Sequence, residues 1–575
     1  MKHTKANGIV CQLSLQSCLA VMLLLSGLAN CPVALADDDD SDLRPGNPLL
    51  SKVIYDNNPN NIVAGVTVLP PNCVGSACVK ATAGGAYPTV FNNALIDGSF
   101  GITSKIVLDQ LTPHGRWIST IEVPNSAQRG VTANSDQMVG SFSSKSEVAL
   151  NLSADRNFVT FMGYMAPIDT IDVSNSNTPF VVDPTNPVSS AYYRVVAQMD
   201  RHGKFRFTKS NAYSGNNGRA AILNNNGSQN IVYTSGNAGN GSNPQPNGVI
   251  VGAGAQILTA SNQPLHAQVD PGLPTPVGSF NITQLGDKAD KIGKDTNFRG
   301  LTVFNNVVYY TKGSGGNGIN TVYFVDTTGF KNGNPLACPT GVGLPGASAT
   351  LPTTPIAHNA SLLQTQGVVP YNMCVLQGFT TTLAKTATAF PFGLWFANAT
   401  TLYVTDEGNG TNTYNASTQT YTAAATQTTA GLQKWVFDSS AGAWKLAYVL
   451  SAGLDLGTPY TVRDYPTGNN ATTNLPWAPS TDGLRNLTGR VNRDGTVTIW
   501  AITSTVSGSG DQGADPNRLV AITDKLAATS LPADESFVTL QTARFAEVLR
   551  GVSFTPGTGV QDDDDGHHAG NGDSQ

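Results

Sequence analysis

Charged side chains are scarce in this chain. Asp, Glu, Lys and Arg together make up 13% of its 575 residues, about half of the ~25% that is typical of soluble proteins. The formal net charge is −6 and the pI is about 5.6. Partners such as nucleic acid or an anionic membrane surface require a basic patch, so this balance argues against both. Hydrophobic residues still account for 40%, which allows a large core and excludes global disorder.

Familiar catalytic motifs are also missing. The sequence contains no G-x-S-x-G elbow, no H-E-x-x-H pair and no P-loop lysine. Two segments match G-x-G-x-x-G, Gly313–Gly318 and Gly508–Gly513, but predicted strands follow both. A dinucleotide fingerprint needs a helix at that point. The histidines between the two ends of the chain are scattered through predicted turns and loops: His114, His202, His266 and His358. The sequence therefore assigns no catalytic residue.

Long apolar runs are missing too, apart from a short one near the start. Lys2 and Lys5 precede an apolar run over Cys18–Ala29, and Ala34–Ala36 is a small-residue cleavage site. The run is too short to span a bilayer, and the whole pattern is typical of a secretory signal peptide. We therefore predict a signal peptide over residues 1–36 and a secreted or periplasmic protein with no transmembrane segment.

A second export signal overlaps the first. Leu28–Cys31 resembles a bacterial lipobox, although Asn30 is a poor match just before the cysteine. Lipid anchoring at Cys31 is therefore the minor alternative. Beyond the leader, residues 37–49 and residues 557–575 both carry runs of aspartate. Runs of like charge are usually solvated, so we predict an acidic flexible segment at 37–49 and a disordered acidic, histidine-containing tail at 557–575.

Cysteine is rare, since cleavage after residue 36 would leave four of the seven. Four cysteines permit three pairings, and an exported protein can form disulfides. Proximity in the sequence favours Cys73–Cys78 and Cys338–Cys374. The alternative is a zinc site, but neither pair has a histidine at ligand spacing. We predict two structural disulfides.

Turn signals are dense in the rest of the chain and helix signals are scarce. Gly, Asn, Asp and Pro punctuate short apolar or alternating segments, which is typical of strands. Five segments share one pattern of a small residue, an apolar strand, a polar hairpin, a second strand and a glycine-rich loop. They are Gly218–Leu223, Arg299–Phe304, Phe392–Phe396, Arg485–Gly489 and Arg550–Phe554. Strand-like units at long, roughly regular spacing predict a β-propeller.

We therefore predict an all-β fold, a single β-propeller of six blades over residues 50–556. Units start near residues 146, 218, 299, 391 and 484, and a last inner strand lies at 550. Seven blades is the alternative if residues 50–87 contain a further one. The strand at 550 has no partners after it, so N-terminal strands should complete its blade and remove exposed edges. The strands expected to do so are Thr89–Asn93, Lys105–Leu108 and Trp117–Val123.

Four longer motifs stand out along the chain: Phe298–Asn305, Phe392–Thr400, Gly510–Asn517 and Glu547–Phe554. In these motifs the chain resembles a group of secreted bacterial β-propeller proteins. The resemblance covers roughly residues 88–556. It implies export and a propeller fold, and it implies no activity, catalytic residue or ligand.

Arginine recurs at one position of the repeat. In a propeller the innermost strands line a central channel, and the starts of these strands share a rim with the loops after the second strands. Four equivalent starts carry Arg219, Arg299, Arg485 and Arg550, and Lys312 reaches the same rim. The guanidinium fork suits carboxylate or phosphate, so the ring of cations predicts a polar or anionic ligand. The alternative is that each arginine pairs with the next blade and holds the ring together.

Acidic residues in the second-strand loops are expected at the same rim: Asp406, Glu407, Asp511 and Asp515. The loop from Asp511 to Asp515 can place two carboxylates on one Ca²⁺, an ion that takes six to eight oxygen ligands. The spacing is not that of an EF-hand, and the alternative is a turn capped by its own side chains. Ca²⁺ is thus a candidate cofactor.

Three functions fit these observations. The leading hypothesis is an exported, monomeric binding or scaffold propeller that holds a polar or anionic small molecule or glycan, such as a polysaccharide, at one rim of the channel. The first alternative is a metal-dependent hydrolase or lactonase in which a channel-mouth Ca²⁺ polarises a substrate oxygen. The second is a structural component of an envelope or matrix. Ligand binding without turnover would favour the binding propeller, and loss of activity with a chelator would favour the hydrolase. Surface display without a rim ligand would favour the structural component.

Overall fold

A computed structural model describes 20 stretches of the chain, called the described residues below. They are residues 43–69, 79–81, 101–132, 134–143, 148–179, 190–210, 212–237, 254–260, 266–267, 278–279, 282–283, 297–313, 319–327, 330–331, 334–335, 342–352, 373–382, 384–470, 473–508 and 513–559. Contacts divide the chain into two units, 1–41 and 42–575, and the fold below is that of the second. The predictions for the leader, Cys31, Cys73, Cys78, Thr89–Asn93, Cys338, Asp511 and the tail from 560 lie outside the described residues.

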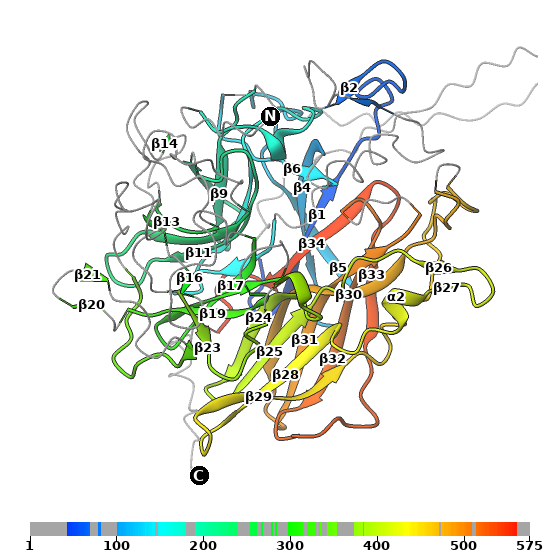
Figure 1. Ribbon diagram of the computed structural model, residues 1–575. Coiled ribbons are helices and arrows are strands. Elements are labelled where there is room, and N and C mark those ends of the chain that lie inside the picture. Colours follow the sequence, from blue (N-terminus) through cyan, green and yellow to red (C-terminus); the bar gives the residue numbers. More distant parts are fainter. Residues whose placement is uncertain are drawn as a thin grey trace, which may run out of the picture. The chain divides into compact units, whose positions relative to one another are not determined.

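The described part of the chain is almost entirely β-structure, arranged in six blades (Figure 1). Blade 1 consists of β7 (Asn151–Leu152), β8 (Val159–Tyr164), β9 (Arg194–Met199) and β10 (Phe205–Ser210). Blade 2 consists of β11 (Gly218–Asn224), β12 (Ile231–Gly236), β13 (Ala255–Thr259) and β15 (Gly278–Ser279). Blade 3 consists of β17 (Phe298–Phe304), β18 (Val307–Lys312), β19 (Thr321–Val325) and β23 (Met373–Leu376).

The remaining blades have the same antiparallel order. Blade 4 consists of β24 (Pro391–Asn398), β25 (Thr401–Asp406), β28 (Gly431–Asp438) and β29 (Ala443–Leu450). Blade 5 consists of β30 (Ser480–Val491), β31 (Thr496–Val506), β32 (Arg518–Lys525) and β33 (Val538–Thr542). Blade 6 consists of β34 (Glu547–Phe554), β1 (Pro48–Ile54), β4 (Ile102–Leu111) and β5 (Trp117–Glu122).

Short strands and helical turns add to the six four-stranded blades. Four strands extend the blades: β6 (Gly140–Phe142), β14 (His266–Ala267), β16 (Ile282–Thr283) and β22 (Val342–Gly343). Three two-stranded sheets pair β2 (Val68–Leu69) with β3 (Val79–Lys80), β20 (Phe330–Lys331) with β21 (Asn334–Pro335), and β26 (Tyr414–Asn415) with β27 (Thr420–Tyr421). Helical turns in the described residues are α2 (Thr422–Ala425), η2 (Val173–Asn175) and η5 (Ala384–Thr386). In this part of the chain no helix has the length and apolarity to cross a membrane.

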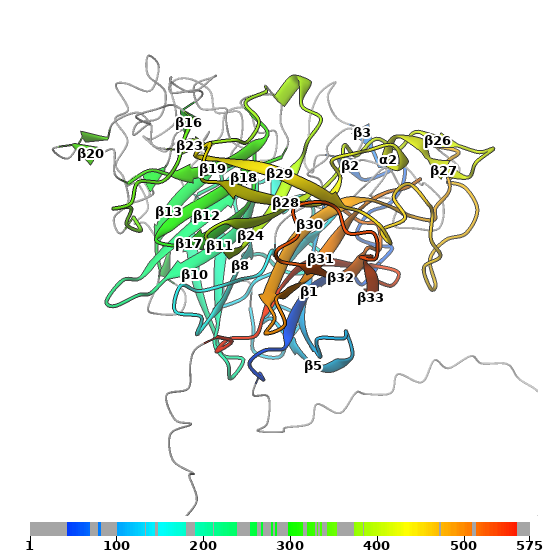
Figure 2. The same cartoon turned by 90° about the horizontal axis from the view of Figure 1, so that it is seen from below.

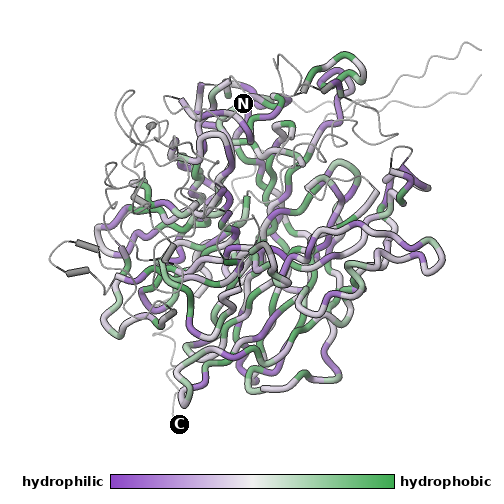
Figure 3. Tube along the Cα trace, in the orientation of Figure 1, coloured by the Kyte–Doolittle hydropathy of each residue, from purple (hydrophilic) through white to green (hydrophobic). Residues whose placement is uncertain are grey.

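The inner strands form a closed ring. Contacts run from β34 to β7, then to β11, β17, β24 and β30, and from β30 back to β34, and Figure 2 shows the same unit turned by 90°. Hydrophobic and hydrophilic residues are interleaved along the blades (Figure 3). Both faces of β8, β9, β11 and β12 are nevertheless buried, because each blade packs between two others. The prediction of a six-bladed, all-β propeller is confirmed.

Strands from both ends of the unit complete blade 6, as predicted. Strand β1 pairs with β34 on one side, with Pro48 opposite Phe554, and with β4 on the other. Figure 1 shows these three strands side by side. Strands β4 and β5 are the predicted outer strands. The neighbour of β34 is Pro48–Ile54, a segment that the sequence did not single out as a strand; the predicted Thr89–Asn93 lies outside the described residues. Leu49 and Val53 of β1 are fully buried, so this segment forms part of the closing blade and not a seventh one.

A β-bulge recurs near the start of the inner strands. The register shifts there and leaves one or two residues unpaired. A Cβ on Gly300 would lie 2.5 Å from the Phe392 carbonyl oxygen, and one on Gly551 would lie 2.7 Å from the Val148 carbonyl oxygen. Glycine at the bulge therefore lets neighbouring inner strands approach closely. The unpaired residues are Arg219, Arg299–Gly300, Phe392–Gly393, Arg485–Asn486 and Arg550.

Hydroxyl groups join the blades at this same level. In five blades a Ser or Thr of the second strand donates a hydrogen bond to a backbone carbonyl at or beside the start of the next inner strand. The pairs are Thr160 to Ala221, Ser235 to Arg299, Thr311 to Phe392, Thr405 to Arg485 and Ser51 to Val148. The repeated sequence motif thus corresponds to a repeated joint between blades, which we call the bulge level.

Candidate functional site

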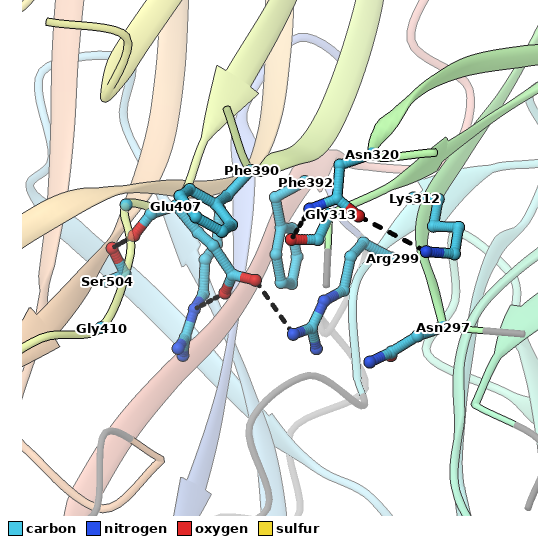
Figure 4. A network of polar contacts seen from close by, with 12 residues as sticks. Asn297, Arg299, Lys312, Gly313, Asn320, Phe390, Phe392, Glu407, Gly410 and Ser504 are labelled. Carbon is cyan, nitrogen blue, oxygen red and sulfur yellow. Dashed lines mark hydrogen bonds and ion pairs between the residues drawn. The ribbon is translucent and has the colours of Figure 1, made fainter. Parts of the chain in front are cut away.

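The predicted rim cations all lie at the bulge level, and all are buried. The Arg299 guanidinium lies 3.0 Å from Glu407 Oε1, and Arg485 Nε donates to Glu407 Oε2 at 3.2 Å (Figure 4). The Phe392 ring packs against both guanidiniums, at 5.6 and 5.8 Å from its centre. Since these residues come from blades 3, 4 and 5, a single carboxylate connects three consecutive blades.

The other predicted cations also contact the protein itself. Arg219 donates to the Phe298 carbonyl oxygen at 3.0 Å and to the Asn297 side chain. Arg550 donates to the carbonyl oxygens of Ser141 and Gly513, at 3.2 and 3.0 Å. Lys312 is 1% exposed, and its Nζ donates to Asn320 Oδ1 at 3.4 Å. The bulge level is therefore a polar layer inside the ring, built from groups of adjacent blades.

Buried carboxyl groups accompany these cations. Asp406 accepts hydrogen bonds from the backbone N–H groups of Phe390 and Gly408, at 2.7 and 3.0 Å. Asp482, which sequence reasoning did not single out, accepts from Gly410 N–H at 2.8 Å and from Gln427 Nε2 at 2.7 Å. Burial, reinforced by nearby carboxylates, raises the pKa of Asp406 to about 6 and that of Asp482 to about 7.

The predicted calcium ligands fall into separate networks. Glu407 binds two arginines, whereas Asp515 Oδ1 accepts from Ser507 Oγ at 2.7 Å and from Tyr465 OH at 3.1 Å. Among the described residues, no group of three or more His, Cys, Asp or Glu is arranged to hold a metal ion. Because Asp511 lies outside those residues, a Ca²⁺ site that includes it stays a prediction.

Cys374 is the one candidate disulfide residue within the described ranges. It lies in β23, is 1% exposed and packs with Val322 and Leu402. Both predicted pairings therefore stay predictions.

Raising the pH from about 5 to about 8 should destabilise the protein. The folded state binds protons more tightly than the unfolded chain, in which Asp titrates near ~4, because Asp482 and Asp406 have raised pKa values. Stability from this effect is present at low pH and is lost as pH rises through about 6 and 7. We expect the free energy of unfolding to fall by roughly 1–3 kcal/mol, measured by urea denaturation across this range.

The control for this prediction is a pair of Asp→Asn substitutions. Asp482→Asn should make the fall with pH smaller, whereas the same change at exposed Asp455 should leave it unchanged. Equal pH profiles for the wild type and Asp482→Asn would contradict the assignment.

The C-terminal ends of the inner strands, away from the bulge level, surround a cavity of about 620 Å³. Strands from all six blades contribute to its wall, which makes it the channel mouth opposite the bulge level. Its lining combines aromatic, hydroxyl, amide and guanidinium groups. The polar and aromatic members are Asn151, Ser153, Arg156, Thr302, Phe304, Trp395, Phe396, Thr488, Arg490, Ser553, Phe554 and Thr558. We call this cavity the strand-end mouth.

Aromatic rings form one wall of the strand-end mouth. Phe304 and Phe396 stack with their centres 4.5 Å apart and their planes 7° from parallel. Trp395 is half-buried and packs on the backbone of the next blade, because a Cβ on Gly489 would lie 2.7 Å from its Cε3 atom. Tight packing fixes the orientation of this indole, so the mouth has a preformed aromatic surface.

Two exposed arginines complete the strand-end mouth. Arg156 follows blade 1's inner strand and has a positive φ of 64°. The Arg490 guanidinium lies 5.6 Å from the centre of the Trp500 ring, and its Nε donates to Asn492 Oδ1 at 3.4 Å. Sequence reasoning missed this mouth. The available signal was the polar Thr302 and Thr488 and the indole of Trp395 in the second halves of the inner strands β17, β30 and β24.

No protein-family model matches the sequence, and no curated protein matches it. Solved structures with a similar arrangement include the hemagglutinin-neuraminidase ectodomain of parainfluenza virus 5, with 10% identity, a TM-score of 0.32, and coverage of 74% of this chain and 76% of that chain. Extracellular domains 1–2 of Drosophila Semaphorin 1a match with 9% identity, a TM-score of 0.28, and coverage of 75% and 84%. The computationally designed Ika8 protein matches with 8% identity, a TM-score of 0.24, and coverage of 71% and 91%.

Proposed function

We propose that this chain is an exported binding protein whose propeller holds a polar or anionic glycan in the strand-end mouth. The observation that carries this proposal is the cavity to which all six blades contribute, with a fixed indole and two exposed guanidiniums in its wall. A concave site with aromatic groups and a few convergent polar groups is the usual form of a small-molecule site. The leader sequence and the resemblance to secreted bacterial propellers support export, and a monomer is the proposed state.

The chemistry of the mouth fits a sugar better than a purely apolar ligand. An aromatic face can pack against the C–H groups of a sugar ring, and the hydroxyl and amide groups of Thr302, Thr488 and Asn151 can exchange hydrogen bonds with its hydroxyls. Arg156 and Arg490 can bind a carboxylate through paired N–H groups. This mouth differs from the arginine rim expected from the sequence, where the cations contact neighbouring blades.

Replacing Trp395 by Ala should weaken glycan binding about tenfold or more, because aromatic anchors at well-packed positions are worth more than ~1 kcal/mol. Isothermal titration calorimetry with neutral and carboxylate-bearing oligosaccharides of two to six units measures the change. The matched control is Trp117→Ala, because Trp117 is 59% exposed and lies outside this mouth.

Three results would contradict the proposal: no binding by the wild type, equal weakening by both tryptophan variants, or release of shorter sugars during the titration. The last result, with loss of cleavage in EDTA, would instead favour the metal-dependent hydrolase.

A further inference from the structure

A second cavity, of about 470 Å³, lies on the face of blade 5 that is turned toward blade 6. Its floor comes from β31, β32 and β33, and one side is the turn between β4 and β5, at Pro113 and His114. Trp500 is 1% exposed, and its Nε1 donates to the Pro113 carbonyl oxygen at 3.0 Å. This bond fixes the turn against the blade, so the side of the cavity is held in place. We call this cavity the blade-5 groove.

The blade-5 groove and the strand-end mouth share one lining residue. Arg490 lines both cavities. Cross-strand pairing places Thr488, Trp500, Ala521 and Val538 in one row across blade 5. This row begins at a residue of the mouth and ends at Val538, which is 57% exposed on the outer edge strand. Since Thr488, Trp500 and Ala521 are buried, the surface link between the two cavities is Arg490, which lies at their border.

A partly exposed polar row leads from Arg490 into the blade-5 groove. The neighbouring row places Arg490 opposite Thr498, and Thr498 opposite Thr523. Thr498 Oγ1 lies 3.3 Å from Thr523 Oγ1 and accepts from Asn492 Nδ2 at 2.9 Å. Lys525, which pairs with Asp534 at 3.4 Å, and His114 add donors in the groove, and Glu535 lies in its wall. A row of hydroxyls beside an apolar strip suits a chain of sugar units better than a single one.

We propose that the ligand is an extended, carboxylate-bearing oligosaccharide chain that passes from the strand-end mouth over Arg490 into the blade-5 groove. This inference rests on the proposed function and deepens it. Arg490 stands at the junction of the two cavities, held over Trp500 and bonded to Asn492. A carboxylate on the sugar unit at the junction would receive the paired N–H groups of this guanidinium. Units on either side would occupy the aromatic mouth and the hydroxyl row.

Affinity should therefore increase with chain length. The experiment titrates the full mature chain with oligogalacturonates of one to six units, and with neutral malto-oligosaccharides of the same lengths. We expect the hexamer to bind the wild type at least tenfold more tightly than the dimer, and the neutral series to bind at least tenfold more weakly than the acidic one. Equal affinity for all lengths would overturn the extended path, and equal affinity for both series would overturn the carboxylate.

Two matched pairs of variants locate the path. Thr523→Trp fills the exposed floor of the groove, whereas Thr539→Trp adds the same bulk on the other face of the blade, because Thr539 pairs with Val520 and not with Ala521. The first should reduce the ratio of hexamer to dimer affinity to about one, and the second should leave it unchanged. Arg490→Ala should reduce the preference for the acidic series, whereas Arg493→Ala, exposed in the adjacent hairpin turn, should not.

The outcomes separate this inference from the proposed function. Absence of binding at every length would refute the proposed function itself. Binding that depends on Trp395 but neither on length nor on Thr523 would leave the function in place and refute the extended chain. An unchanged melting temperature for each variant shows that loss of fold does not cause the effect. If Thr523→Trp lowers the melting temperature, Arg490→Ala decides the test in its place.

Discussion

Replacing Lys434 by Met is expected to lower the free energy of unfolding by about 3–5 kcal/mol, the usual cost of removing one partner from a buried ion pair. Lys434 Nζ lies 2.9 Å from Asp524 Oδ2, and both side chains are 0% exposed. Nζ also donates to Tyr448 OH at 2.9 Å and to the Lys525 carbonyl oxygen at 2.7 Å. The pair joins β28 of blade 4 to β32 of blade 5, so its loss weakens a junction between blades.

The cost arises mainly from the carboxylate that remains. Asp524 would keep the hydrogen bonds donated by Tyr403 and Tyr448 but would lose its only cationic partner among the ion pairs of the described residues. An uncompensated buried charge is expensive. Glu535 lies beside it, and burial together with a hydrogen bond to Asp524 raises the pKa of Glu535 to about 7. A second carboxyl group therefore adds repulsion once it ionises.

Chemical denaturation of Lys434→Met at neutral pH measures this effect. The control is Lys445→Met, in the next strand of the same blade, because Lys445 pairs with Asp438 at the surface and is 64% exposed. An exposed pair contributes little, so this variant should not change stability measurably. Similar results for the two variants would contradict the argument.

Glu407→Gln is the second substitution with a large expected effect, again about 3–5 kcal/mol. Its carboxylate is the shared partner of Arg299 and Arg485, and all three side chains are at least nine-tenths buried. The amide carries no charge, so both guanidiniums would lose an ionic partner at once. Desolvation already lowers the pKa of Arg299, and the nearby Arg485 lowers it further, whereas Glu407 raises it.

The effect of Glu407→Gln should be read from denaturation curves and compared with Glu122→Gln. Glu122 pairs with Lys105 at 3.6 Å, and its side chain is 35% exposed, so the loss there should be small. A loss of less than about 1 kcal/mol for Glu407→Gln would show that the bulge-level arginines are compensated by other groups.

The fold could be predicted from the sequence because the repeated motif corresponds to the contact between neighbouring blades at the bulge level. An arginine or phenylalanine recurs, in four cases next to glycine, since five of the inner strands bulge where they approach a neighbouring blade. This signal locates five of the six inner strands. The inner strand without this signal is β7. The signal also does not locate β1, the second strand of blade 6, whose partners are about five hundred residues away in β34 and some fifty residues away in β4. A seven-residue strand with no local hairpin partner has no sequence signature of its own.

The candidate site was harder to predict for a related reason. The strand starts repeat in sequence, which directs attention to the arginines, whereas the strand ends differ from blade to blade. Trp395 and Arg490 have no counterpart at the equivalent positions of the other blades. They line the same mouth only because six strands of different sequence end there. The ion pair between Lys434 and Asp524 could not be predicted from the sequence either, because its two residues lie in different blades and neither belongs to a repeated motif.

The pairing of β1 with β34 has a mechanical consequence. The strands are antiparallel, and Pro48 at the start of β1 lies opposite Phe554 at the end of β34. Tension on the two ends of the unit would therefore pull this ladder apart from one end, so that its hydrogen bonds are loaded one after another and never together. A protein held at both ends would open first at blade 6. The five remaining blades would stay folded until the load passed β4, which gives the ring a built-in point of release under stretch.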